Sequence, residues 1–222
     1  MLDKIFRRSD TIDREALCIL AGERVRTFPT FFYSLPTHLT PFSPNKKYKQ
    51  VWHLRVAIHA LADAGSLLDC ASLACAAALR HFRRPEVEVL GANDVIVHPP
   101  EQRAPVPLAL HHTPYCITFA FYRAAPESSS AGAGTAAGET GTAPRVLLDP
   151  AGLEQRLSQG MLHLALTPQR ELAVVHKAGG LPLAPEVLMG AVQVAARRAK
   201  ELDAWLDVRV REDWARKKVE VR

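Results

Sequence analysis

The sequence lacks the features that mark membrane-spanning and secreted proteins. No apolar run approaches the roughly 20 residues that a membrane-spanning helix needs, and the first ten residues, MLDKIFRRSD, contain no apolar core of a signal peptide. Cysteines are few and stand in apolar stretches, without the paired spacing of a zinc site. We therefore expect reduced, buried thiols in an intracellular protein, with no metal or other cofactor. The four are Cys18, Cys70, Cys75 and Cys116.

The composition is that of a globular protein but leaves its partner open. With 222 residues, of which 48% are hydrophobic and 23% charged, the chain is long enough for a sizeable core in one domain or at most two. The net charge of +5 permits a polyanionic partner such as RNA. Because a modest positive charge is common, charge alone does not establish RNA binding.

Hydrophobic periodicity predicts an α+β chain. Residues 51–61 alternate apolar and polar side chains, which is typical of a half-buried strand. Residues 67–82 are nearly continuous in Ala, Leu and Cys, so we expect a buried helix, apolar nearly all round, that ends by Pro85. Further strands are predicted at 16–21, 87–90, 95–97 and 117–121, a hairpin at 161–166 and 171–176, and helices at 1–9, 185–206 and on to about 219.

Two segments do not fit this pattern. Residues 124–144 are rich in Ala, Gly, Ser and Thr, which predicts a low-complexity linker. Residues 25–50 contain four prolines and no amphipathic period, and removing them joins Gly22–Arg24 directly to Val51. The segment starts with Val, whose codons begin GT, and ends with Gln, which CAG can encode. We therefore interpret it as a retained intron translated in frame; a genuine surface insertion is the alternative.

The strings around the predicted buried helix carry a family resemblance. They are VWHLRV at 51–56, DAGSLLDCASLACAAALRHFRRPEV at 63–87, PVPLALHHTPYCITFAFY at 105–122 and, more weakly, AGGLPLAPEVL at 178–188. Together they resemble the RNase PH-like ring subunits of the RNA exosome, and among these the non-catalytic type.

This resemblance implies an RNase PH-like fold, an α+β fold similar to ribosomal protein S5 domain 2. One part of the fold would occupy residues 1–123 and a second part residues 145–222, on either side of the linker. Family members normally carry further strands before the point at which this sequence begins. The chain therefore resembles an N-terminally truncated member.

The resemblance also indicates a vestigial site for phosphate and acid. In active members the turn that matches Asp63–Ser66 holds inorganic phosphate and continues with Arg, whereas here Leu67 follows. An acidic cluster of active members matches 146–157, where Asp149 is kept but most of the other acids are replaced. We therefore expect no catalytic residue, with Gly65, Ser66 and Asp149 as remnants. Read structurally, Ser66 is a helix N-cap and Asp149-Pro150 a turn.

Basic residues are the candidates for RNA contact. Lys4 and Arg7 lie three residues apart on the first helix and match positions where related subunits face the central channel. Arg83 and Arg84 leave the buried helix and could reach phosphate, a neighbouring subunit or only water. The adjacent His111-His112 pair is interpreted as structural, because neighbouring strand residues point to opposite faces.

By resemblance, the expected function is that of a non-catalytic ring subunit that helps thread RNA toward a 3′→5′ nuclease, in rRNA maturation, RNA surveillance and mRNA turnover. Expected partners are other RNase PH-like ring subunits, cap subunits with S1 or KH modules, and RNA, but no membrane. The expected location is nucleus and nucleolus, and also cytoplasm. Two alternatives stay open: a phosphate-dependent 3′→5′ exoribonuclease, active alone or through a composite site, and a non-functional product of a truncated gene.

Overall fold

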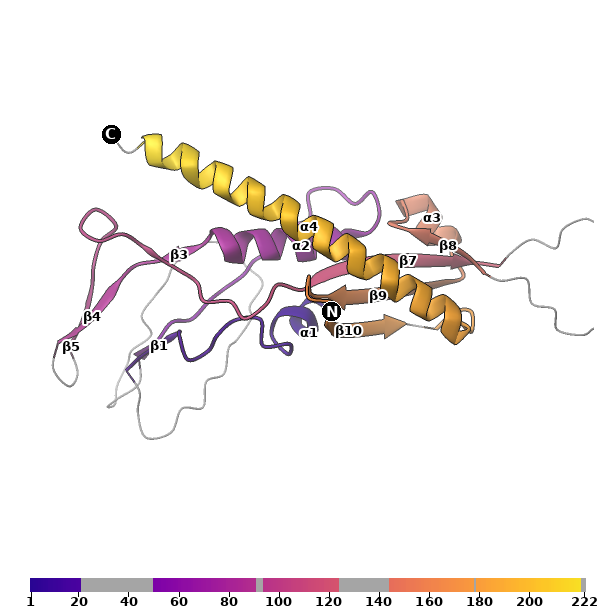
Figure 1. Cartoon of the computed structure of the whole chain (residues 1–222), viewed down its shortest axis with the longest axis horizontal. Helices are drawn as coiled ribbons and strands as arrows, with labels where there is room; N and C mark the ends of the chain where they lie inside the picture. Colours follow the sequence, from indigo (N-terminus) through magenta and orange to yellow (C-terminus); the bar gives the residue numbers. More distant parts are fainter. Residues whose placement is uncertain (21–49, 91–93, 124–143, 178, 221–222) are drawn as a thin grey trace, which may run out of the picture.

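The computed structural model describes residues 1–20, 50–90, 94–123, 144–177 and 179–220, which form a mixed helix and sheet structure (Figure 1). The predicted linker and nearly all of the predicted 25–50 insert lie outside these ranges. In chain order the elements are α1 (Leu2–Phe6), β1 (Cys18–Leu20), β2 (Gln50–Val51), α2 (Leu67–His81), β3 (Arg83–Arg84), β4 (Val87–Leu90), β5 (Asp94–Val97), β6 (Val106–Pro107), β7 (Tyr115–Tyr122), β8 (Arg145–Leu148), α3 (Gly152–Leu157), β9 (Gly160–Leu166), β10 (Leu172–Lys177) and α4 (Pro185–Glu220).

A four-stranded antiparallel sheet organises the molecule, in the order β10-β9-β7-β8. Its central strand β7 is buried over seven of its eight residues, which agrees with the apolar run YCITFAFY. The predicted hairpin is confirmed as β9 and β10. Since β7 precedes the linker and its neighbours β8 and β9 follow it, the two predicted parts of the chain share one sheet.

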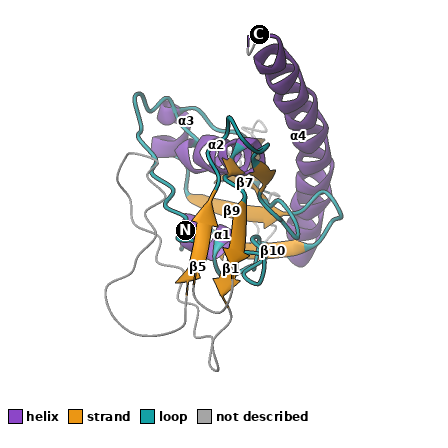
Figure 2. Cartoon of the chain, turned by 90° about the vertical axis from the view of Figure 1, so that its left-hand side faces the viewer, coloured by secondary structure: helices purple, strands orange, loops and turns teal. Residues whose placement is uncertain are grey.

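Alternation along the strands divides the core between the two faces of the sheet. Odd-numbered residues of β7 and even-numbered residues of β9 pack with Ala191, Ala195 and Ala199 of α4. Cys116 and Ala165, on the opposite face, pack with Ile5 and Phe6 of α1. Helix α2 contributes to both clusters and contacts β7. Figure 2 shows α4 running past the sheet toward the C terminus.

Helix α2 forms as predicted, but it is not buried all round. Cys70, Ala74 and Ala78 are exposed, whereas Ala71, Cys75, Ala76 and Leu79 are buried. The prediction of four buried thiols is therefore wrong for Cys70 and only partly met for Cys18, which is half-buried; all four cysteines are free. An Ala-rich helix can be apolar all round and still leave one face to solvent, since alanine exposes little apolar surface.

The predicted strand at 51–61 is wrong as a backbone assignment. Only Gln50 and Val51 pair, antiparallel to β1, with Cys18 opposite Val51. The alternation nevertheless appears in the burial from Trp52, which is buried, to Arg55, which is exposed, and it is lost at 56–58, which are all half-buried. The backbone N–H of Trp52 donates to the carbonyl oxygen of Leu17 at 2.8 Å, but beyond it no second strand lies along residues 53–60 in the described ranges.

The C-terminal region is one helix rather than two. Helix α4 spans 36 residues without a proline after its first position, and its distal half leaves the sheet and runs toward the C-terminal end of α2 (Figure 1). The short strands predicted at 87–90 and 95–97 form as β4 and β5; they pair antiparallel and project away from the main sheet. None of the helices in the described part of the chain has the length and apolarity to cross a membrane.

Candidate functional site

Two turns that the sequence singles out lie directly against each other. Gly65 has φ of +115°, and a Cβ atom at this position would lie 2.5 Å from the carbonyl oxygen of Pro150. The backbone N–H of Gly152 donates to the carbonyl oxygen of Ala64 at 2.7 Å. Only glycine allows this approach, because its φ is unfavourable for other residues and a side chain would overlap the backbone. The structure thus brings Gly65, Ser66 and Asp149 into one place.

Ser66 takes the N-cap position of α2, but its hydroxyl does not cap the helix. The residue is 3% exposed with φ of 46°, and its Oγ donates to the carbonyl oxygen of Pro150 at 3.2 Å. The Ser66 hydroxyl, which could bind an anion at this turn, is therefore already hydrogen-bonded to the neighbouring turn. The next residue, Leu67, is 40% exposed and brings no charge.

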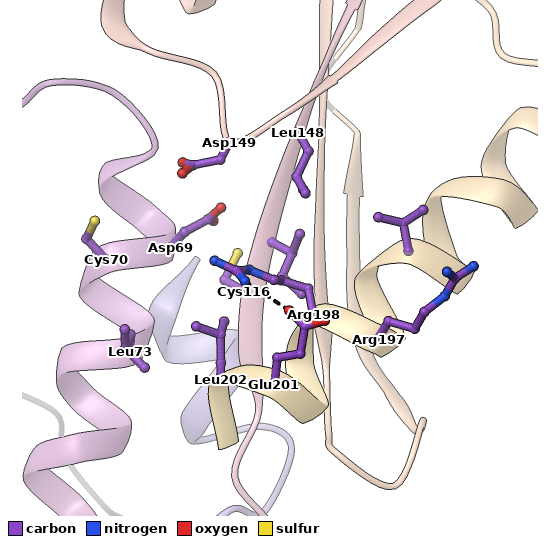
Figure 3. A pocket seen from close by; sticks show the side chains of 12 residues that line it. Asp69, Cys70, Leu73, Cys116, Leu148, Asp149, Arg197, Arg198, Glu201 and Leu202 are labelled. Atoms are coloured by element: carbon purple, nitrogen blue, oxygen red, sulfur yellow. Dashed lines mark hydrogen bonds and ion pairs between the residues drawn. The ribbon is translucent and has the colours of Figure 1, made fainter. Parts of the chain in front are cut away.

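A cavity of about 590 Å³ opens beside this junction, between α2, β7, β8 and α4 (Figure 3). The carboxyl groups of Asp69 and Asp149 lie near each other at its wall. From α4, Arg198 reaches toward the cavity and pairs with Glu201 at 2.9 Å. The cavity therefore carries both signs of charge and has mainly apolar side chains between them.

Asp69 is the best-connected acid of the cavity. Its Oδ2 accepts the backbone N–H of Thr118 at 2.7 Å, and its Oδ1 accepts the Thr118 hydroxyl at 2.6 Å. Burial raises the pKa of this carboxyl to about 6, against the opposing effect of the Thr118 hydrogen bonds. No lysine or arginine pairs with Asp69 in the ranges that the structure covers.

The polar chain continues across the sheet from Thr118. His163 is its partner on β9, with Nδ1 2.8 Å from the Thr118 hydroxyl, and His176 is the partner of His163 on β10. Burial and, second, the neighbouring His176 lower the pKa of His163. The Nδ1 of His176 is buried without a hydrogen-bond partner among the described residues. Three polar side chains thus form a row on one face of an otherwise apolar sheet.

Cys116 lies next to this row on β7. It is 2% exposed, and burial followed by the nearby Asp69 raises the pKa of its thiol. One ligand atom each from Asp69, Cys116 and His163 lie within 4.8 Å of one another. Sequence reasoning missed this cluster because its members come from three elements. The available signal was one polar residue inside each apolar strand sequence, namely Thr118 in ITFAFY and His163 in MLHLAL.

The four basic residues predicted to contact RNA divide into two pairs. Lys4 is exposed on α1, and Arg7 pairs with Asp3 at 3.3 Å on the same short helix. Arg83 donates to the carbonyl oxygen of Arg80 at 2.9 Å and lies 4.7 Å from the ring centre of Trp214. Arg84 is half-buried opposite Val106. None of the four lines the cavity.

The two adjacent histidines do not lie on a strand, as their interpretation assumed, but just after the isolated bridge at Leu110. The Nε2 of His111 lies 3.9 Å from Asp13, and the Nε2 of His112 lies 3.4 Å from the hydroxyl of Ser9. The two rings thus have separate partners.

Comparison with known proteins gives a consistent picture. Residues 130–198 match the model of the 3′ exoribonuclease family, domain 2. The chain is 31% identical to the exosome complex component RRP45 of Homo sapiens over 202 residues, which are 91% of this chain and 36% of the human protein. It is 30% identical to rrp45 of Schizosaccharomyces pombe over 195 residues, which are 88% of this chain and 52% of that protein.

A solved structure supports the fold. The chain aligns with a subunit of the Archaeoglobus fulgidus exosome with RNA bound to the active site, at a TM-score of 0.56 and 20% identity. The alignment covers 91% of this chain and 57% of the archaeal one. The predicted RNase PH-like α+β fold is thereby confirmed. The chain spans between about a third and a half of the length of the curated relatives described above.

Proposed function

The chain is a relative of the RNase PH-like subunits of the RNA exosome, and from this relationship we propose that it acts as a ring subunit that does not itself cut RNA. The observation that carries the proposal is the similarity to RRP45, which extends over nine-tenths of this chain in both human and fission yeast proteins. In the ring it would contact other RNase PH-like subunits, and a cap subunit with S1 or KH modules would lie above it.

The junction of the two turns supports the absence of catalysis. The backbone of 150–152 occupies the space beside Gly65. The Ser66 hydroxyl donates to the carbonyl oxygen of Pro150. The next residue is the uncharged Leu67, where a cation would be needed. A phosphate nucleophile would need freed N–H groups and positive charge at this turn. RNA would instead pass the exposed basic residues Lys4 and Arg7 on its way to a nuclease elsewhere in the complex.

A second candidate function rests on a specific observation. Asp69 and Asp149 present two carboxyl groups to one cavity, and paired carboxyl groups can serve acid-base chemistry. This arrangement, with Arg198 at the same cavity, favours a phosphate-dependent 3′→5′ exoribonuclease that is active itself or through a composite site with a neighbouring subunit.

Reconstitution tests both. The full chain, tagged and co-expressed with the other ring and cap subunits, is purified under native conditions and its stoichiometry measured by native mass spectrometry. We expect one copy in an intact ring; a ring that assembles without it, or a chain that never joins, contradicts the proposal.

The same ring is then given 3′-labelled RNA and inorganic phosphate. Release of nucleoside diphosphates that is lost on Asp149→Asn would establish the second function instead.

We also propose that the protein occupies the nucleus, the nucleolus and the cytoplasm, where the complex is needed for rRNA maturation, surveillance and mRNA turnover. Fluorescence imaging of the tagged endogenous protein tests this. Signal confined to another compartment contradicts it.

A further inference from the structure

We propose that Asp69, Cys116 and His163 bind a divalent transition-metal ion, with Zn²⁺ as the best match. Carboxylate, thiolate and imidazole are the three ligand types that zinc takes in proteins. The residues come from α2, β7 and β9, three elements held together by the core, so the cluster does not depend on a loop. The inference is independent of the proposed function.

The distances allow the ion with small movements. The candidate ligand atoms lie within 4.8 Å of one another. Around a tetrahedral zinc ion with bonds of about 2.0–2.3 Å, ligand atoms are separated by roughly 3.3–3.8 Å. The three side chains therefore need to close by about 1 Å, which rotation about their side-chain bonds can supply.

The neighbours of the cluster hold its members in place. The backbone N–H of Thr118 fixes one oxygen of Asp69 at 2.7 Å, and the Ser72 hydroxyl accepts the backbone N–H of Cys116 at 3.0 Å. Partners of this kind orient metal ligands and strengthen binding. The Thr118 hydroxyl bridges Asp69 and His163, so metal binding would exchange these two hydrogen bonds for bonds to the ion.

The charges balance on binding. A metal–sulfur bond forms as the Cys116 S–H bond breaks, and the proton leaves to solvent. One thiolate and one carboxylate then neutralise the two positive charges, with a neutral imidazole as third ligand. Since Asp69 and Cys116 also line the cavity of about 590 Å³, the fourth position faces this cavity and takes a water molecule (Figure 3).

The test uses the purified full chain, stripped with a chelator. Isothermal titration measures Zn²⁺ binding, and Co²⁺ absorption spectra report tetrahedral geometry and a thiolate–cobalt band. We expect one ion per chain and a thiolate band. Cys116→Ser should abolish the band, and His163→Gln should weaken Zn²⁺ binding by more than the roughly 10–100-fold that loss of an outer partner costs.

Cys18→Ser is the matched control, because this free, half-buried thiol on β1 is outside the cluster and does not line the cavity. It should keep both the affinity and the band. Circular dichroism checks that each variant is folded, and His163→Gln is the variant least disruptive to folding because the amide can still bond Thr118. Absence of stoichiometric binding, or equal affinity in the wild type and His163→Gln, overturns the proposal and leaves a hydrogen-bonded row only.

Discussion

Gly65 is the residue on which the junction of the two turns depends. Its φ of +115° and the backbone of 150–152 beside it leave no room for a side chain. We predict that Gly65→Ala lowers the free energy of unfolding by about 3 kcal/mol or more, since it adds backbone strain to a steric overlap that only a main-chain shift can relieve. Urea denaturation followed by circular dichroism measures this.

Gly190 provides the control for that substitution. It lies within α4, and a Cβ there meets nothing within 4 Å. Gly190→Ala should leave stability unchanged or raise it by about 0.5–1 kcal/mol, because alanine favours the helix. Equal stability of the two variants would show that the turns are not packed as described.

Asp213 links pH to the attachment of α4. Hydrogen bonds from His81 at 2.7 Å and from Lys217 lower the pKa of its carboxyl. A carboxyl whose pKa is lowered on folding stabilises the folded state above the ordinary value of 3.8, and this contribution is lost as the pH falls further. We predict that Asp213→Asn lowers the Tm near neutral pH and that the difference from wild type vanishes in acid. A difference that stays constant from neutral pH to pH 3 contradicts the prediction.

At this scale the sequence groups Gly65, Ser66 and Asp149 by resemblance, and the structure brings them together, whereas it does not indicate the cluster of Asp69, Cys116 and His163. Gly65, Ser66 and Asp149 could be found because each belongs to a local motif that resembles a family pattern. The cluster of Asp69, Cys116 and His163 could not, because its members become neighbours only through the register of β7 with β9 and the packing of α2 on β7. Periodicity assigns a residue to a face but does not say what lies opposite.

At the scale of elements, the ion pairs that join α4 to α2 can be tested by substitution. Arg80 of α2 donates to Asp203, to Asp207 at 2.5 Å and to the hydroxyl of Thr113 at 3.0 Å, with its side chain 19% exposed. We predict that Arg80→Gln lowers the free energy of unfolding by about 2–4 kcal/mol, because it leaves the mostly buried Asp203 without its cation and Asp207 with only the longer pair to Arg211 at 3.9 Å. Backbone amides in the distal half of α4 should also exchange faster in hydrogen-exchange mass spectrometry.

Arg209→Gln is the comparison for Arg80→Gln. Arg209 lies on α4 itself and pairs with Glu212 on the same helix at 3.0 Å, and both side chains are more than half exposed. Loss of an exposed pair should cost less than about 1 kcal/mol. If the two variants match in stability and exchange, the ion pairs of Arg80 do not hold the helix.

Elements with their own periodicity were predictable, whereas those that depend on a neighbour were not. Helix α2, strand β7 and the β9–β10 hairpin follow from their own sequences. Residues 52–60 have the alternation of a strand, but a strand also needs a partner, and the described chain supplies only the three residues of β1. Similarly, α4 continues past the sheet because α2 and Arg83 offer contacts to its distal half, which the helical pattern alone did not reveal.

For the molecule as a whole, the shared sheet predicts that the two parts of the chain stay together without their covalent connection. Strand β7 from the first part lies between β8 and β9 from the second. If a protease site is inserted within residues 126–142 and cut under native conditions, we expect the two fragments to co-elute in gel filtration. Fragments that separate without denaturant would mean that the sheet does not join them.

The overall fold class was predictable through resemblance, and the pairing of strands was not. The strings at 51–56, 63–87 and 105–122 indicate an RNase PH-like fold by resemblance alone. The central place of β7, with partners only from the later part of the chain, follows from long-range packing that no local pattern encodes.

That arrangement has a consequence for how the protein is made. A ribosome releases its product from the N terminus, so the most buried strand emerges before either of its neighbours exists. Strand β9 begins at Gly160, which is 38 residues beyond the end of β7 at Tyr122. Strand β8, which pairs with the other edge, begins at Arg145, 23 residues beyond Tyr122. At roughly 5–20 residues per second, both edges of YCITFAFY therefore stay open for about 1–5 s, and the edge that pairs with β9 for about 2–8 s. The nascent chain is most in need of a chaperone during this interval.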